Sequence, residues 1–173
     1  LGFSIFGRDI EYALDKNLNL DLSKIKSFQN KYKNEEILIF GFTYLIWEKF
    51  INQLEKLGLN LDFNNGLLIH GGGWKKLQVK SISNHDFKKK IHNLLNISKV
   101  HNYYGMVEQT GSIFMECKKG FLHSSEYSDI IIRDTQTFKQ KGLNEQGFIQ
   151  LISTIPKSYP GHSLLTEDEG VLI

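Results

Sequence analysis

The sequence has one cysteine and almost no net charge, and each scarcity excludes a class of protein. A single thiol, Cys117, cannot form an internal disulfide, which fits a reducing compartment, and we expect a cytoplasmic protein. The 21 lysines and arginines are nearly balanced by 19 aspartates and glutamates, which leaves a net charge of +2. Since a nucleic-acid backbone requires a dense positive face, no nucleic-acid partner is expected.

Long apolar runs and linker-like stretches are also missing. The longest apolar runs, residues 37–42 and 66–69, are far short of the roughly 20 residues that a membrane span needs, and no basic-then-apolar leader is present. Neither repeats nor Pro-rich tracts interrupt the chain, so we expect residues 1–173 to form one compact unit. Because the chain begins at Leu1 and ends on the apolar, strand-like residues 171–173, we expect a segment of a longer protein.

Strand and helix patterns alternate over the first hundred residues. Compact apolar strands are predicted at residues 36–40, 67–70 and 99–104. Apolar residues at helical spacing predict one helix after the first strand, ended by Gly58, and another that is capped by Asn84. The apolar positions of these two helices are Trp47, Phe50, Ile51, Leu54, Phe87, Ile91, Leu94 and Leu95.

The order of these elements predicts an α/β fold. Strand–helix–strand units with a mainly parallel sheet are expected over about residues 36–104, preceded by a helix at 23–31 that Asp21 or Ser23 caps. In such sheets, function gathers at the carboxyl ends of the strands. A β-rich segment without helices is expected over about residues 112–173. Its predicted strands are residues 112–116, 129–133 and 148–153.

Two segments that follow predicted strands carry residues suited to a nucleotide. The first is the glycine triplet Gly71 to Gly73, where backbone groups can approach a flat ligand closely, although alone it favours an ordinary tight turn. The second is the loop at residues 103–112. Its aromatic ring can stack on adenine, its glycines admit phosphates, and its carboxylate can hold Mg²⁺. The simpler interpretation of this loop is a polar turn in which Tyr104 caps the core.

The run Tyr-Gly-Met-Val-Glu at residues 104–108 resembles the aromatic-Gly-x-Thr-Glu signature of the adenylate-forming superfamily. Together with Gln109 and the Gly-Ser-Ile-Phe run at 111–114, it is similar to the acyl-protein synthetases, the synthetase component of the fatty-acid reductase complex in luminous bacteria. The resemblance covers nearly the whole chain from about residue 36. Other segments similar to family motifs are residues 40–43, 71–77, 116–117, 131–134 and 158–168.

The resemblance implies an adenylation site. It implies that Tyr104 stacks on adenine, that Glu108 is the catalytic carboxylate that binds magnesium, and that Asp168 binds the ribose hydroxyls as a two-fold acceptor. The glycine triplet resembles the segment that lines the adenine pocket. The residues assigned to the nucleotide are Gly71, Gly72, Gly73, Tyr104, Gly105, Gln109, Thr110 and Asp168, and the implied cofactors are ATP and Mg²⁺.

The chain also departs from the pattern of the superfamily. Val107 stands where a hydroxyl residue is usual, and Gln109, Thr110 or Ser112 are candidates for the missing phosphate contact. The upstream phosphate loop, the downstream hinge, the small C-terminal domain with its catalytic lysine and the acyl-accepting cysteine have no counterparts. We therefore expect residues 1–173 to be part of an adenylate-forming large domain that is inactive alone.

The function that the resemblance implies is ATP-dependent activation of a fatty carboxylate. The acid attacks the α-phosphate to give an acyl-adenylate and pyrophosphate, and a protein thiol then takes the acyl group. An acyl reductase or an acyl-carrier protein is the implied partner. Two alternatives remain open: an acid–coenzyme A ligase resembling the phenylacetate ligases, and a non-catalytic module that binds a nucleotide or docks to a reductase.

Two other patterns have simpler interpretations. Cys117 and His123 are suitable zinc ligands, but a structural site normally takes four ligands, and a buried structural cysteine is the simpler interpretation. The run Tyr-Pro-Gly-His-Ser at residues 159–163 holds a serine and a histidine without a nucleophile elbow or an acid partner. It is interpreted as a shaped turn near the nucleotide.

Overall fold

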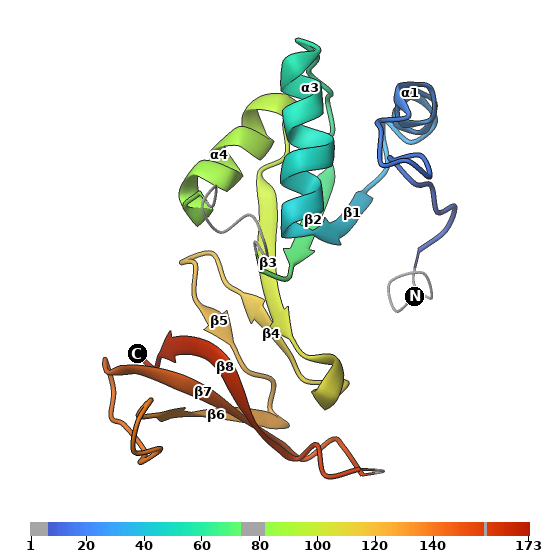
Figure 1. The fold of residues 1–173 in the computed structure, drawn as a ribbon. Helices are drawn as coiled ribbons and strands as arrows, with labels where there is room; N and C mark the ends of the chain where they lie inside the picture. Colours follow the sequence, from blue (N-terminus) through green and yellow to red (C-terminus); the bar gives the residue numbers. More distant parts are fainter. Residues whose placement is uncertain (1–6, 74–81, 158) are drawn as a thin grey trace. The chain divides into compact units, whose positions relative to one another are not determined.

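The computed structural model describes residues 7–73, 82–157 and 159–173. The chain divides into two compact units, Leu1–Asn102 and Tyr103–Ile173, which are described separately below (Figure 1). The prediction that both belong to a single adenylate-forming domain stays a prediction. Within the described residues, no helix has the length and apolar character to cross a membrane.

The first unit contains parallel strands with helices between them. Strands β1 and β2 run parallel, in a register that pairs Ile37 with Gly66 and Phe42 with Gly71. Strand β2 lies between β1 and β3 in the sheet. The strands and helices of this unit are α1 (Leu22–Lys31), β1 (Ile37–Phe42), α2 (Thr43–Leu45), a π-helical segment (Ile46–Ile51), α3 (Asn52–Lys56), β2 (Gly66–Gly71), α4 (Asn84–Leu95) and the start of β3 (Lys99–Gly105).

The helix ends show which local signals were interpreted correctly. Asp21 caps α1, because its carboxylate accepts a hydrogen bond of 3.1 Å from the backbone N–H of Lys24. Gly58, with φ of +64°, follows the last turn of α3 as predicted. The predicted cap of α4 was wrong by one residue: Ser83 accepts from the N–H of Asp86, and Asn84 is the first helical residue. Both types can cap a helix, but only Ser83 has the extended backbone that a cap requires.

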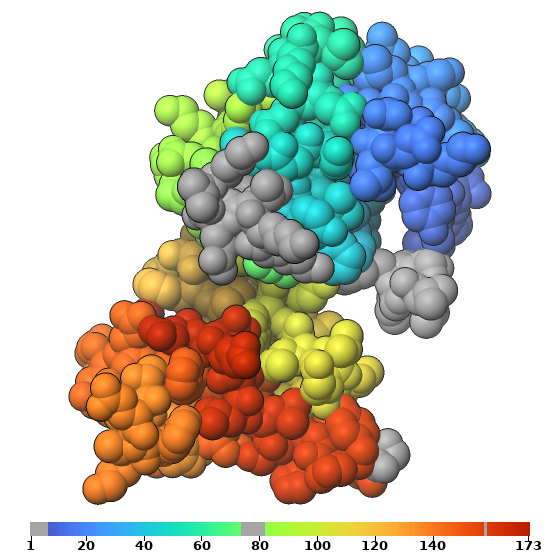
Figure 2. Space-filling view, in the orientation of Figure 1, coloured from blue at the N-terminus to red at the C-terminus, as the bar shows by residue number. Residues whose placement is uncertain are grey.

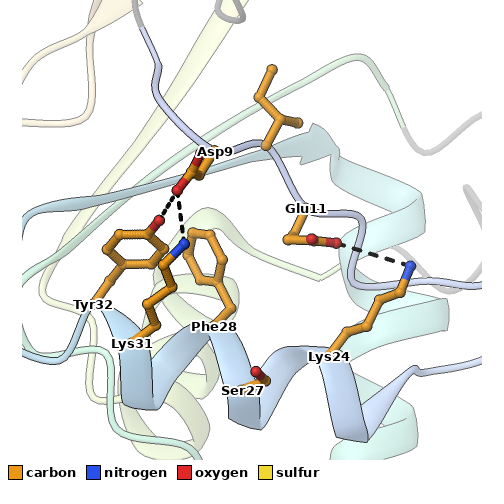
Figure 3. Close-up of a pocket in the computed structure, with 8 residues that line it drawn as sticks. Asp9, Glu11, Lys24, Ser27, Phe28, Lys31 and Tyr32 are labelled. Atoms are coloured by element: carbon orange, nitrogen blue, oxygen red, sulfur yellow. Dashed lines mark hydrogen bonds and ion pairs between the residues drawn. The ribbon is translucent and has the colours of Figure 1, made fainter.

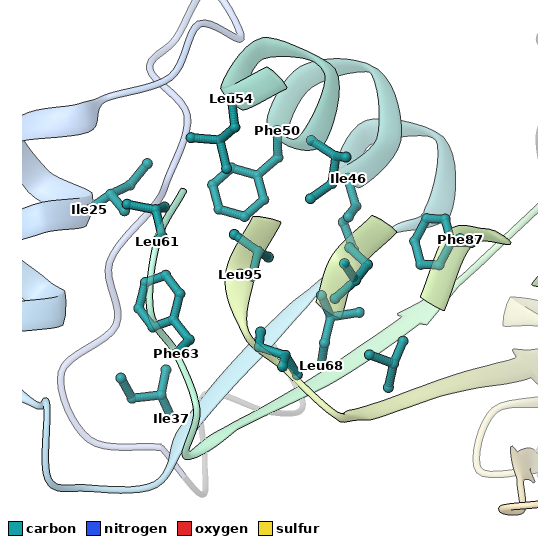
Figure 4. Close-up of a cluster of buried hydrophobic side chains, with 14 residues drawn as sticks. Ile25, Ile37, Ile46, Phe50, Leu54, Leu61, Phe63, Leu68, Phe87 and Leu95 are labelled. Atoms are coloured by element: carbon teal, nitrogen blue, oxygen red, sulfur yellow. The ribbon is translucent and has the colours of Figure 1, made fainter. Parts of the chain in front are cut away.

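Apolar side chains from the helices and strands form one core in this unit (Figure 4). Every predicted apolar helix position packs in this core or against it, with Trp47 and Leu94 only partly buried. The far sides of the helices are exposed, and atoms of α1 and α3 form part of the surface in Figure 2. The side chains with no exposed area are Ile51, Leu54, Leu68, Ile91, Leu95 and Ile97.

The second unit is built from antiparallel strands. Strand β4 pairs with the end of β3 and with β5, while β6, β7 and β8 form a separate sheet. These strands are β4 (Ile113–Glu116), β5 (Leu122–His123), β6 (Ser128–Arg133), β7 (Gln146–Ser153) and β8 (Ser163–Val171). The predicted α/β class, a mainly parallel sheet followed by a β-rich segment, is confirmed. Two strands were missed, since β5 has two residues and β8 carries a run of acidic side chains.

Truncation of Leu54 in α3 tests the core of the first unit. Leu54 has no exposed area, so Leu54→Ala should lower the free energy of unfolding by about 2–5 kcal/mol. Urea unfolding followed by tryptophan fluorescence measures it, because Trp47 packs against this core. The matched control is Leu57→Ala, whose side chain is 56% exposed and should change the stability by less than about 0.5 kcal/mol. Equal losses in both variants would contradict this core.

Candidate functional site

A tight turn follows β3 and, together with the end of that strand, carries five of the nine predicted site residues. The turn holds a short 3₁₀ helix, Val107–Gln109, and returns the chain antiparallel as β4. The N–H of Gln109 donates to the carbonyl of Met106, and the N–H of Ser112 donates to that of Gln109, both at 3.1 Å. Gly111 has φ of +95°, a conformation that side chains rarely adopt, so the reversal requires glycine there. The turn therefore places Tyr104 and Glu108 on one short segment of the second unit.

Tyr104 and Asp168 meet although 64 residues separate them. The Tyr104 hydroxyl, on β3, donates a 2.7 Å hydrogen bond to Oδ2 of Asp168 on β8. The buried Thr166 hydroxyl accepts from the N–H of Asp168 at 3.2 Å and donates to the carbonyl of Ile149 at 2.8 Å. This anchors the strand beside the carboxylate. Two residues that the resemblance assigned to adenine and ribose thus form one pair.

The environment of Tyr104 keeps its phenol protonated. Partial burial, followed by the hydrogen bond to the Asp168 carboxylate, raises the pKa of Tyr104 above its ordinary value, and the charge of Glu108 acts in the same direction. The ring packs edge-on against Phe114, with ring centroids 6.1 Å apart. At neutral pH, Tyr104 is therefore a hydrogen-bond donor to Asp168, and its half-buried ring remains partly accessible.

Glu108 presents a free carboxylate. Its side chain is exposed and has no hydrogen bond or ion pair within the part of the chain that the structure describes. Only its backbone carbonyl is engaged, as the acceptor of a hydrogen bond from the Tyr159 hydroxyl. A carboxylate with both oxygens available is a suitable ligand for a hard cation.

The other polar side chains of the turn hold the turn itself. Gln109 is fully buried, and its side-chain N–H group donates to the carbonyl of Gly161 at 2.8 Å. The Thr110 hydroxyl donates to the carbonyl of Val107 at 3.0 Å, and the Ser112 hydroxyl is buried and accepts from Ser128 at 3.1 Å. Gly105 is exposed at the end of β3. The assignment of Gly105, Gln109 and Thr110 to a nucleotide stays a prediction.

The glycine triplet lies in the first unit, at the carboxyl end of β2. Gly71 is buried as the last residue of the strand, whereas Gly72, with φ of +75°, and Gly73 are exposed. The Thr43 hydroxyl donates to the Gly71 carbonyl at 3.2 Å and lies 2.9 Å from Nδ1 of His70. Which of the two atoms donates in the Thr43–His70 contact depends on the tautomer of the imidazole. Residues 74–77 of the same motif lie outside the described residues, and the role of the triplet in an adenine pocket stays a prediction.

A pocket of about 470 Å³ in the first unit contains none of the predicted site residues (Figure 3). It lies between residues 9–11 and α1. Its charged groups satisfy one another, since Asp9 accepts from Lys31 and Tyr32 while Lys24 is paired with Glu11. A hollow lined by groups that are already paired offers little to a charged ligand.

The described residues contain no ready-made cluster of metal ligands. Within them, no group of three or more histidine, cysteine, aspartate or glutamate side chains could hold a metal ion. A zinc site needs such a group, whereas magnesium is usually held by one or two carboxylates and the phosphates of a substrate. The assignment of magnesium to the free carboxylate of Glu108 stays a prediction.

Cys117 begins the turn between β4 and β5. Its N–H donates to the carbonyl of Phe121 at 2.9 Å, and its sulfur accepts from the N–H of Lys119 at 3.4 Å. Backbone hydrogen bonds from Phe121 and Lys119, and then the neighbouring His123, lower the pKa of the Cys117 thiol to about 7. Cys117 is half-buried, so the predicted structural cysteine lies at the surface of a hairpin rather than in the core.

The reactivity of Cys117 should follow its lowered pKa. Alkylation by iodoacetamide depends on the thiolate, so the rate should rise with pH through a midpoint near 7. In urea-unfolded protein, the midpoint should return to about 8.5. His123→Ala should move the folded midpoint upward, because it removes one of the groups that favour the thiolate. A rate that stays flat between pH 6 and 8 would show that these contacts do not act on the thiol.

The pairing of Tyr104 with Asp168 can be measured by a double-mutant cycle. Tyr104→Phe and Asp168→Ala each remove one partner of a half-exposed hydrogen bond and should show a coupling of about 1 kcal/mol in the free energy of unfolding. Urea unfolding of the two single variants and the double variant gives this coupling. Tyr127→Phe is the control, because Tyr127 is 61% exposed and its hydroxyl has no partner in the described residues. Strictly additive effects would contradict the pair.

From the sequence, Tyr159 and Gly161 were predicted only to form part of a shaped turn near the nucleotide. In the structure, both contact the 107–110 turn: the Tyr159 hydroxyl bonds to Glu108 and Thr110, and the carbonyl of Gly161 accepts from Gln109. The one sequence feature that pointed to a role for these two residues was their position in a run similar to a family motif. Their contacts with the turn span about 50 residues, and contacts at such separations produce no periodic pattern in a single sequence.

Comparison with solved structures places the fold among adenylate-forming ligases. ATP-bound MatB from Rhodopseudomonas palustris matches with a TM-score of 0.56 and 13% identity, over 84% of this chain and 30% of that one. An open conformation of a 2-hydroxyisobutyryl-CoA ligase, in complex with 2-HIB-AMP and CoA, matches with a TM-score of 0.64 and 14% identity, over 86% and 31%. A luciferase-like enzyme from the mealworm Zophobas morio gives 0.55 and 20%, over 86% and 37%.

Sequence comparison identifies the family. A curated relative, the long-chain-fatty-acid–luciferin-component ligase of Aliivibrio fischeri, is 23% identical over 94% of this chain. The chain spans 43% of the length of that relative. The model of the family described as "Acyl-protein synthetase, LuxE" matches residues 8–173. The chain therefore belongs to the acyl-protein synthetase family, as the motif around Tyr104 and Glu108 predicted.

Proposed function

We propose that this chain supplies the adenine-, ribose- and metal-binding side of an ATP-dependent carboxylate-activating site. The observation that carries the proposal is the hydrogen bond between Tyr104 and Asp168, in the same unit as the free carboxylate of Glu108. Membership of the acyl-protein synthetase family and the adenylate-forming ligase fold support it. The ATP-bound state of MatB supports ATP as the nucleotide.

Each residue has a task that its surroundings allow. The half-buried ring of Tyr104 offers a face on which adenine stacks, while its hydroxyl fixes one oxygen of Asp168. The remaining acceptor capacity of Asp168 suits the ribose hydroxyls. Glu108 would hold magnesium, which when bound neutralises the charge of the nucleotide phosphates. All three side chains come from the second unit.

The proposed reaction has two steps. A carboxylate oxygen attacks the α-phosphorus of ATP, an oxygen–phosphorus bond forms, and pyrophosphate leaves. The sulfur of a thiol then attacks the acyl carbon, AMP leaves with the bonding electrons, and the thiol releases its proton. A long-chain fatty acid as substrate and a protein thiol as acceptor are supported by the family and by the name of the Aliivibrio fischeri relative. An acyl reductase or acyl-carrier protein as partner, and a cytoplasmic location, belong to the same proposal.

Two observations favour competing functions. The likeness to a ligase solved with CoA favours coenzyme A as the thiol acceptor. A transfer assay that offers either coenzyme A or a protein thiol decides between these two acceptors. Val107, which is 85% exposed where the superfamily usually has a hydroxyl residue, favours a module that binds a nucleotide without turnover. Pyrophosphate exchange separates that module from an enzyme.

Pyrophosphate exchange by the full-length protein, across a panel of carboxylic acids, tests the proposal. Glu108→Gln and Asp168→Ala should each lower the exchange rate about 100-fold or more, because they remove a charge that acts on the phosphates or the ribose. Residues 1–173 alone should give no exchange. Glu126→Gln is the control, since Glu126 is an exposed carboxylate of the same unit outside the site, and it should retain the wild-type rate. Undiminished exchange in both site variants would overturn the assignment.

A further inference from the structure

Residues 159–161 contact three consecutive residues of the turn that carries Glu108. The Tyr159 hydroxyl donates to the backbone carbonyl of Glu108 and accepts from the N–H of Thr110 at 3.4 Å. Between these two residues, the buried side chain of Gln109 donates to the carbonyl of Gly161 at 2.8 Å. One aromatic hydroxyl and one backbone carbonyl therefore hold the turn at residues 108, 109 and 110.

Gly161 allows this close approach because it has no side chain. A Cβ atom at this position would lie 2.9 Å from the carbonyl oxygen of Glu108 and 2.3 Å from the ring of Tyr159. The first of these atoms belongs to the backbone and cannot rotate away. The 159–161 segment and the 107–110 turn consequently fit together at backbone distance.

From these contacts we infer that Tyr159 is a positioning residue that fixes the Glu108 carboxylate for magnesium, with Gly161 making the space for it. The inference rests on the proposed function, because that function assigns magnesium binding to Glu108. Tyr159 touches neither the metal nor the nucleotide in this scheme, and it acts only through the backbone of the turn.

The need for such a residue follows from the exposure of Glu108. Its carboxylate has no hydrogen bond or ion pair within the described residues, so its position depends on its own rotamers and on the backbone of a three-residue 3₁₀ segment. Short 3₁₀ segments have poor hydrogen-bond geometry and little stability of their own. The hydrogen bonds of Tyr159 to Glu108 and Thr110 restrict the peptide planes on both sides of Gln109. A metal-binding carboxylate that is held in place in advance loses less conformational entropy when the metal binds.

Amide hydrogen exchange tests the contact without any nucleotide. Tyr159→Phe keeps the ring and removes only the hydroxyl, so the Thr110 amide, which donates to it, should exchange about five-fold faster. Tyr127→Phe, which removes an exposed hydroxyl of the same unit, should leave this rate unchanged. Unchanged exchange in Tyr159→Phe would overturn the inference, whatever the protein binds.

The magnesium dependence of pyrophosphate exchange in the full-length protein tests the consequence. Tyr159→Phe should raise the Mg²⁺ concentration for half-maximal rate about five-fold, while the rate at saturating Mg²⁺ and the KM for ATP there stay close to wild type. A merely structural loss would lower the rate at every Mg²⁺ concentration. Gly161→Ala should show the same displacement, more strongly.

The outcomes separate the two proposals. A displaced Mg²⁺ requirement together with faster exchange of the Thr110 amide supports the positioning role. An unchanged Mg²⁺ requirement, in an enzyme whose Glu108→Gln variant is impaired, overturns that role and leaves the proposed function intact. Wild-type protein without Mg²⁺-dependent exchange would overturn the proposed function, and the role of Tyr159 with it.

Discussion

The reversal of the chain between β3 and β4 is the constraint on which the candidate site depends. Two antiparallel strands are joined by a turn that carries a 3₁₀ segment and a glycine at φ of +95°. Tyr104 precedes the turn on β3, and Glu108 lies within it. Because the pairing of Tyr104 with Phe114 fixes the register, the turn cannot move without carrying both side chains with it. The residues that form the turn therefore also determine the geometry of the candidate site.

The polar groups of the turn divide into those that hold it and one that is left free. Gln109 and Ser112 are buried and bonded to neighbours, and the Thr110 hydroxyl is bonded within the turn. The amide N–H group of Gln109 and the hydroxyls of Ser112 and Thr110 each have a partner, whereas the buried Oε1 of Gln109 has no hydrogen-bond partner among the described residues. Glu108 differs, since its carboxylate faces outward without a partner in the described residues. Under the proposed function, this division leaves the exposed Glu108 carboxylate as the group of the turn that is available to a cation.

Local signals in the sequence predicted most of the helices and strands. They could not predict which residues that are far apart in the sequence contact each other. The helices of the first unit followed from apolar spacing and end signals, although Ser83 and Asn84 both suit a cap and only the backbone distinguishes them. Strand β8 was missed because the consecutive acidic residues Glu167, Asp168 and Glu169 interrupt the alternation of apolar and polar residues that is typical of a strand. The structure shows that this segment is a strand because it pairs with β7. The resemblance named Tyr104 and Asp168 separately, while the hydrogen bond between them depends on how β3 and β8 fold.

Val107 shows how the framework constrains the chemistry. The superfamily usually has a hydroxyl residue at this position, and here an exposed valine replaces it. The Thr110 hydroxyl donates to the carbonyl of Val107 and Ser112 is 2% exposed, so either residue would have to change its hydrogen bond or become exposed before it could contact a phosphate. With one phosphate donor fewer, more of the phosphate charge would have to be balanced by the cation at Glu108. Under the proposed function, the Glu108 carboxylate, and the turn that Tyr159 and Gly161 hold in place, would then carry a larger share of the binding than in a site that keeps the hydroxyl.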